Sequence, residues 1–115
     1  MSAILKKHAG LLKLLHKAPP KLKRSLLKQH SNKSDFVRCM SDCCYNILKG
    51  NIPLNRGQLS KLRRQKRVIR AIADKKTSLK KKKQIIQKGG FLAAILPPII
   101  GALGSLFGGL LGSRH

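Results

Sequence analysis

Apolar residues recur at helical spacing in the first part of the chain. In residues 3–17 one helical face holds Ile4, Leu5, His8, Leu11, Leu12 and Leu15, and lysines occupy most of the other. Pro19 and Pro20 end this helix, a weaker cationic segment follows over residues 21–28, and residues 29–33 read as a polar linker. Residues 1–33 are therefore predicted to be a basic amphipathic segment, which lies on a membrane surface or packs against the next part of the chain.

The most regular pattern runs from Ser34 to Lys88. A stripe with helical spacing contains Phe36, Val37, Met40, Cys43, Cys44, Ile47 and Leu48. Ser34 or Asp35 is the expected N-cap, and Gly50 is the expected glycine just beyond the end of the helix. A second helix is predicted over about residues 56–75, with an apolar side of Leu59, Leu62, Ile69 and Ile72. A third, capped by Thr77 or Ser78, is predicted over residues 78–87.

The composition changes abruptly after Gly89-Gly90. Residues 91–113 contain no ionisable side chain and are long enough, as a helix, to cross a hydrocarbon core of about 30 Å. Pro97-Pro98 is expected to break the helix, and the glycines at 104, 108 and 112 give two GxxxG spacings. Three interpretations stay open: a membrane anchor, a membrane-disturbing peptide, or an apolar handle for other proteins. The apolar residues are Phe91, Leu92, Ile95, Leu96, Ile99, Ile100, Leu103, Leu106, Phe107, Leu110 and Leu111.

These patterns together predict an all-α protein. A small basic helical hairpin or three-helix region, residues 34–88, lies between the amphipathic segment 1–33 and a partly disordered Gly/Pro-rich tail, residues 89–115. Three such helices would bury roughly a dozen side chains, near the lower size limit of a domain that folds unaided.

The charge indicates a polyanionic partner. The net charge is +23, and all bases except Arg114 precede residue 91, so residues 1–90 carry +22. The exposed face of the second helix holds Lys61, Arg63, Arg64, Lys66, Arg67 and Arg70. With three acids in the chain, few bases are paired internally, which favours binding to nucleic acid phosphates and, second, to an anionic membrane. Aromatic residues are scarce, so base stacking and sequence readout are not expected.

No enzyme class is indicated by the sequence. It contains no readable acid pair, Ser/His/Asp arrangement or phosphate loop, and no cofactor is expected. Cys39, Cys43 and Cys44 lack the spacing of a four-ligand zinc site, and His30 is a poor fourth ligand. We interpret the three cysteines as small apolar side chains on a helix, with no metal bound. The lysines within residues 1–15 are not typical of a signal peptide.

Two sequence features resemble known families. Gln87-Lys88-Gly89-Gly90 followed by Phe91 resembles the cleavage pattern of adenovirus-type maturation cysteine proteases, which cut after the second glycine. The basic run, Gly-Gly and apolar tail ending in Arg-His resemble the adenovirus core protein precursor pX, parent of the mu peptide. Residues 43–92, with Asn51-Ile52-Pro53-Leu54, the stretch from Asp74 to Lys80 and Gly89-Gly90-Phe91-Leu92, resemble the small basic proteins of Polinton/Maverick elements and adintoviruses more closely.

The resemblance implies a non-enzymatic core protein of the virion or host nucleus that binds packaged double-stranded DNA. It also implies trimming of a precursor by a maturation cysteine protease at Gly90–Phe91, through Gln87, Gly89, Gly90 and Phe91. The implied DNA contacts are Lys61, Arg63, Arg64, Arg67, Arg70, Lys80, Lys81, Lys82 and Lys83, and Lys66 shares their helix face. The alternative function is a membrane-active or tail-anchored cationic protein that uses residues 91–113, and a third is a cationic antimicrobial or toxin-like peptide.

Overall fold

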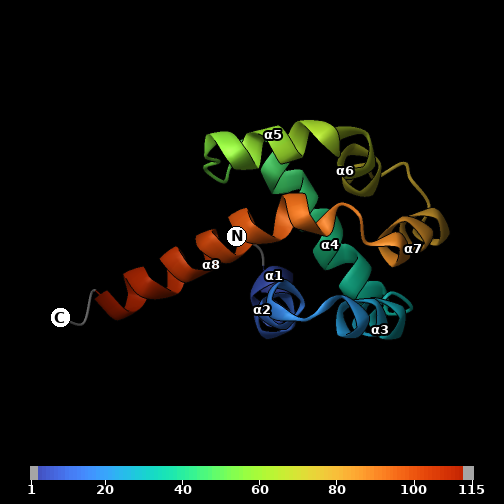
Figure 1. Cartoon of the computed structure of the whole chain (residues 1–115), viewed down its shortest axis with the longest axis horizontal. Coiled ribbons are helices and arrows are strands. Elements are labelled where there is room, and N and C mark those ends of the chain that lie inside the picture. The colour runs from blue at the N-terminus through green and yellow to red at the C-terminus, as the bar shows by residue number, and fades with distance from the viewer. Residues whose placement is uncertain (1–2, 113–115) are drawn as a thin grey trace.

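One central helix organises the protein. The computed structural model describes residues 3–112, with side chains from residue 3 to residue 102. Helix α4 (Ser34–Leu48) lies diagonally across the middle of the molecule and contacts α1, α6, α7 and α8 (Figure 1). The other helices are α1 (Ala3–Lys7), α2 (Ala9–Lys17), α3 (Pro20–His30), α5 (Arg56–Arg64), α6 (Lys66–Ala73), α7 (Leu79–Lys88) and α8 (Leu92–Gly112). The predicted all-α class is confirmed.

Helix α4 follows the predicted stripe at its buried face. Phe36, Val37, Met40, Cys43 and Cys44 are buried, together with Cys39. The helix ends as expected at Gly50, whose φ of 75° lies in the left-handed region. The Gly50 amide donates to the Ile47 carbonyl at 3.2 Å and the Asn51 amide donates to the Asn46 carbonyl at 3.0 Å, which satisfies the last carbonyls of the helix.

The predicted N-cap of α4 is wrong. The helix begins at Ser34, its N-cap residue is Lys33, and no side chain caps it. The Asp35 carboxylate lies in the first turn and pairs instead with Lys7, with 3.3 Å between Nζ and Oδ2. An acidic side chain there still interacts favourably with the positive end of the helix dipole.

Two helices expected to be continuous are broken. The amino-terminal helix divides into α1 and α2 at His8, whose Nδ1 donates to the Ile4 carbonyl at 2.9 Å. The predicted helix 56–75 divides into α5 and α6 at Gln65. Because α5 packs against α8 whereas α6 packs against α4, the break lets each half meet a different helix. Leu59, predicted on the apolar side of this helix, is 38% exposed.

Local caps fix the starts of the basic helices. Asn55 and Gln58 form a capping box at α5: the Gln58 amide donates to Asn55 Oδ1 at 2.8 Å, and the Asn55 amide donates to Gln58 Oε1 at 3.1 Å. Ser78 caps α7 as predicted, because its Oγ accepts from the Lys81 amide at 3.2 Å. The expected linker at residues 29–33 is shorter, since α3 continues to His30 and Ser31 is buried.

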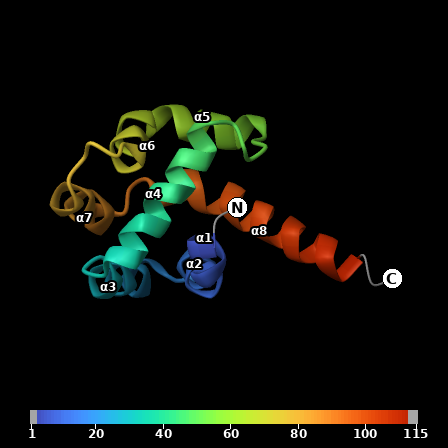
Figure 2. The ribbon, with the colours of Figure 1, turned by 180° about the vertical axis from the view of Figure 1, so that it is seen from behind.

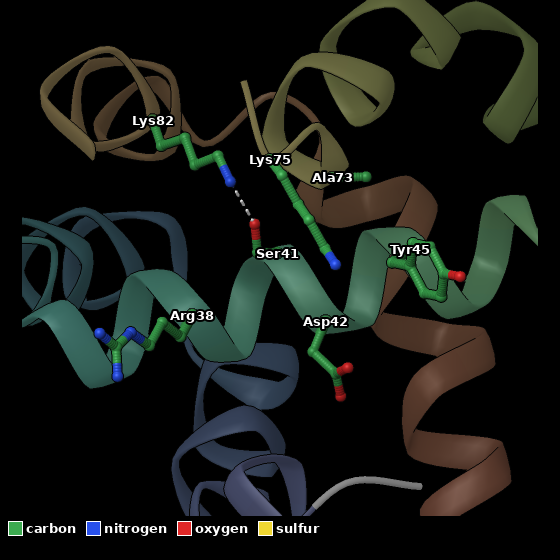
Figure 3. Close-up of a pocket in the computed structure, with 7 residues that line it drawn as sticks. All are labelled: Arg38, Ser41, Asp42, Tyr45, Ala73, Lys75 and Lys82. Atoms are coloured by element: carbon green, nitrogen blue, oxygen red, sulfur yellow. Dashed lines mark hydrogen bonds between the residues drawn. The ribbon is translucent and has the colours of Figure 1, made fainter. Parts of the chain in front are cut away.

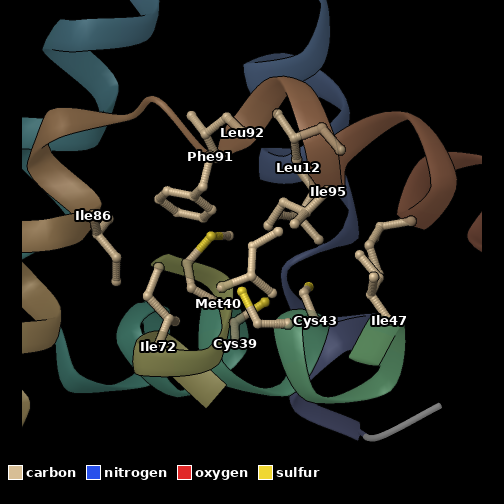
Figure 4. Packing of buried hydrophobic residues seen from close by; sticks show 14 of the residues in the cluster. Leu12, Cys39, Met40, Cys43, Ile47, Ile72, Ile86, Phe91, Leu92 and Ile95 are labelled. Atoms are coloured by element: carbon tan, nitrogen blue, oxygen red, sulfur yellow. The ribbon is translucent and has the colours of Figure 1, made fainter. Parts of the chain in front are cut away.

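The core takes residues from every segment of the chain. Leu5, Leu12 and Leu15 from the amino-terminal helices and Phe91, Leu92, Ile95 and Ile99 from α8 join the buried face of α4. Figure 4 shows Phe91 beside Met40, and Ile95 near Leu12. The sequence left two interpretations open for residues 1–33, and in the structure residues 3–33 pack against the rest of the chain. The change at residue 90 is therefore one of composition and not a boundary of the core.

Helix α8 continues through the two prolines that were expected to break it. Pro97 and Pro98 lie inside the helix, where each removes a backbone donor. Ile95 and Leu96 before them and Ile99 after them are all buried, so packing on both sides offsets the loss. The carboxy-terminal part of α8 extends away from the other helices (Figures 1 and 2).

Candidate nucleic-acid interface

The helices α5 and α6 present seven bases to solvent, of which six were selected from the sequence. Asn55 and Gln58 fix the start of α5, and burial of Ile69 and Ile72 against α4 orients α6. The opposite surface is therefore left to the charged side chains, as the helical pattern predicts. All six predicted residues here are exposed: Lys61, Arg63, Arg64, Lys66, Arg67 and Arg70.

The four consecutive lysines of α7 differ in their exposure to solvent. Lys80 and Lys81 are exposed and Lys83 is partly exposed. Lys82, which was predicted among the DNA-contacting residues, points toward α4 and is 8% exposed. Its Nζ donates to Ser41 Oγ on α4 at 2.7 Å. Because the side chains of a helix point in successive directions 100° apart, a run of four lysines on a packed helix cannot all face solvent.

The Lys82 ammonium takes part in a chain of contacts that joins three helices. Ser41 Oγ accepts from Lys82 and donates to the Ile72 carbonyl at the end of α6. Burial lowers the pKa of Lys82, and the charges of Asp74 and the Cys44 thiol act in the opposite direction. No local pattern predicts this contact, because Ser41 and Lys82 are 41 positions apart.

Bases from three helices surround the Gly-Gly junction, and Lys23, Arg24 and Lys88 among them were not selected from the sequence. One groove of about 220 Å³ is lined by Lys23 and Arg24 of α3 together with Lys88, Gly89 and Gly90. A second, also about 220 Å³, is lined by Lys61 and Arg64 of α5 together with Gly90 and Ala93. Gly90 therefore lies between bases from three helices that are remote in sequence.

The predicted cleavage motif forms a closed turn. Gly89 has a φ of 70° and ends α7, with its amide donating to the Ile86 carbonyl at 3.0 Å. Gly90 is exposed but Phe91 is fully buried, and Gln87 Nε2 donates to Ser31 Oγ at 3.0 Å. A protease needs an exposed, extended backbone at the bond that it cuts. Phe91 does not meet this requirement, because the core takes up the first residue of the tail.

The tail residues have two surroundings. Phe91, Leu92, Ile95, Leu96 and Ile99 are buried, and Ile100 is partly buried against the same core. For residues 103–112 the structure describes the helical backbone and not the side chains. This part of the tail contains Leu103, Leu106, Phe107, Leu110, Leu111 and the GxxxG glycines. Among the residues searched, no single helix is long and apolar enough to cross a bilayer. Helix α7 and Leu92–Ala102 together reach that length and composition, but they are bent by 95°.

The cysteines lie in the core, as interpreted from the sequence. Cys39, Cys43 and Cys44 are free and buried on α4. A hydrogen bond with the Cys39 thiol, followed by burial, raises the pKa of Cys43, and burial raises the pKa of Cys44. Within the part of the chain that the structure describes, no group of three or more His, Cys, Asp or Glu side chains could hold a metal ion.

Comparison of the chain with protein-family models, with curated proteins and with solved structures gives no match.

Proposed function

We propose that this protein is a virion core protein precursor that binds packaged double-stranded DNA by charge neutralisation. The observation on which this rests is the excess of exposed bases: the sequence has 26 Lys and Arg residues and 3 acids, and seven exposed bases lie on α5 and α6. Lysine and arginine side chains displace counterions from DNA phosphates whatever the base sequence. The exposed bases of α5, α6 and α7 would supply these contacts.

Charge variants test whether the α5–α6 surface is the interface. Replacing Arg63, Arg64 and Arg67 with Gln removes three exposed charges. The matched control replaces three exposed lysines, Lys6, Lys17 and Lys21, with Gln. We expect the first variant to reduce the slope of log K against log salt by about 2.7, at about 0.9 per lost phosphate contact. We expect the control to reduce it by less than about 1. Equal reductions would show that net charge alone matters and would contradict a localised interface.

Processing after Gly90 is the second part of the proposal. The cleavage pattern at Gln87, Gly89 and Gly90 supports it, and so does the exposed backbone at Gly90. Because Phe91 is fully buried, the protease must act when the start of α8 leaves the core. Intact mass of the protein from particles is expected to give a species ending at Gly90. A mass for residues 1–115 throughout would refute processing.

Membrane association is the second candidate function. The carboxy-terminal part of α8 extends from the helical body and its sequence is uncharged as far as Ser113. A leakage assay on liposomes with the full chain, with and without bound DNA, tests it. Leakage by free protein with no measurable DNA binding would favour the membrane function over the proposed one. DNA binding without leakage would exclude a membrane-disturbing role.

A further inference from the structure

A groove separate from the α5–α6 surface runs between α4, the end of α6, the following linker and α7. Its volume is about 360 Å³. Three cations line it from three places in the sequence: Arg38 of α4, Lys75 of the linker and Lys82 of α7 (Figure 3). The remaining lining residues are Ser41, Asp42, Tyr45 and Ala73.

Lys82 is the unusual member of this groove. Its side chain is 8% exposed, yet no carboxylate of the described residues lies within 4 Å of its ammonium. The ammonium has three N–H donors, of which one is used on Ser41 Oγ at 2.7 Å. Ser41 donates its own proton to the Ile72 carbonyl, so its oxygen serves Lys82 as a neutral acceptor. A buried charge is costly unless a counter-charge or further hydrogen bonds satisfy it.

The other two cations line the same groove, and Figure 3 draws the Arg38 guanidinium directed away from the Lys82 ammonium. Arg38 is exposed and offers a planar guanidinium, the group best suited to bind two oxygens of one phosphate. Lys75 is exposed and reaches across the groove between Ser41 and Tyr45 (Figure 3). The Asp42 carboxylate points away from the Ser41–Lys82 hydrogen bond. The charge of Asp74 acts on Lys82, but the two do not form an ion pair within 4 Å.

A second groove continues from the first. It has a volume of about 470 Å³, shares Tyr45, Ala73 and Lys75 with the first, and adds the bases Arg70 and Lys76 and the acid Asp74. The two grooves together bring bases from α4, α6, the linker and α7 along one side of the molecule. An anion that repeats along a chain can therefore contact both grooves at once.

We propose that the groove of Arg38, Lys75 and Lys82 is a phosphate-binding site, which takes an oxyanion of the DNA backbone on the two spare Lys82 donors, with the exposed Arg38 side chain turning in to meet it. This inference rests on the proposed DNA-binding function and names a specific site within it. It differs from the surface of α5 and α6 because one of its cations is buried and held in place by Ser41. A phosphate here completes the hydrogen bonding of Lys82, which water-exposed lysines do not require.

A pair of lysine variants on one helix tests the site. Lys82→Met keeps an unbranched side chain and removes the charge, and Lys80→Met makes the same change at an exposed position of α7. A hydrogen bond to a charged group contributes about 1.5–3 kcal/mol, so we expect Lys82→Met to weaken duplex binding at least tenfold in about 0.3 M salt. One lost exposed contact weakens it by roughly threefold under the same conditions. Arg38→Gln is the second variant, and it tests the site if Lys82→Met does not fold. Because Arg38 is exposed, the change should leave the fold intact, and we expect it to weaken duplex binding as much as Lys82→Met.

The nitrogen resonance of the Lys82 ammonium reports the ligand directly. We expect it to shift when a 12-base-pair duplex is added, and to shift less with inorganic phosphate at the same phosphate concentration. Equal effects of Lys82→Met and Lys80→Met on duplex binding would overturn the site and leave the proposed function standing. A shift with inorganic phosphate but none with the duplex would overturn the assignment to DNA and show a site for free phosphate. If the duplex does not bind at all, the proposed function fails. A shift of the Lys82 resonance with inorganic phosphate would then identify the groove as a site for free phosphate.

Discussion

Cleavage at Gly90–Phe91 should depend on how firmly the start of α8 is held in the core. Ile95, four residues beyond Phe91, is 0% exposed and packs in the same cluster as Leu12 and Met40. Ile95→Ala removes three carbon atoms, which corresponds to about 2.4 kcal/mol of transfer free energy, and the cavity raises the cost to about 3 kcal/mol. If the protease acts on an opened state, cleavage should accelerate roughly 150-fold, because each 1.4 kcal/mol is a factor of ten in the opening equilibrium.

Native-state proteolysis measures this acceleration. A protease that cuts before large apolar residues is added in limiting amount, and mass spectrometry follows the product that begins at Phe91. Leu79→Ala is the control, because it removes a leucine that is 47% exposed on the adjacent helix and should change the rate by less than about fivefold. Equal rates for Ile95→Ala, Leu79→Ala and the unchanged chain would refute the reasoning. They would show that the bond is cut without any opening of the core.

Three further predictions concern stability. Gly50→Ala should destabilise the protein by about 1–2 kcal/mol, because the φ of Gly50 is 75°. Gly10→Ala, at an exposed position inside α2, should stabilise it by about 0.8 kcal/mol. Denaturant titration of the two variants measures both changes in unfolding free energy. Asn55→Ala removes the capping box of α5 and should lower the unfolding free energy by about 1 kcal/mol in the same titration, so an unchanged midpoint would contradict the cap. Lys82→Met should raise the melting temperature at pH 7, and the gain should shrink as pH rises towards 10.5. Because the folded-state pKa of Lys82 is lowered, its unfavourable charge is present at low pH and disappears as pH rises through that pKa. A gain in melting temperature that grows with pH would contradict this reasoning.

The sequence predicted the parts of the fold that depend on neighbouring residues. The stripe from Phe36 to Ile47 identified the buried face of α4, because a helix repeats its faces every 3.6 residues. Gly50 and Ser78 were predicted because each performs a local backbone function that few other residues perform. The exposed bases of α5 and α6 followed from the same periodicity.

The remaining features depend on which helices meet. Periodicity shows that Ile95 has an apolar environment, but it does not distinguish a bilayer from the core of the same chain. The break at Gln65 reflects packing of α5 on α8 and α6 on α4, which no local signal announces. Lys82 could not be separated from its three lysine neighbours until Ser41 was placed opposite it.

The most direct test of the account is the salt dependence of binding by the full chain to two DNA duplexes of unrelated sequence. We expect the two affinities to agree within about twofold at every salt concentration. We expect log K to fall linearly with log salt, with a slope of about −0.9 for each phosphate neutralised and near −5 for about six contacts. An affinity that is independent of salt, or that differs strongly between the two duplexes, would contradict DNA binding by charge neutralisation.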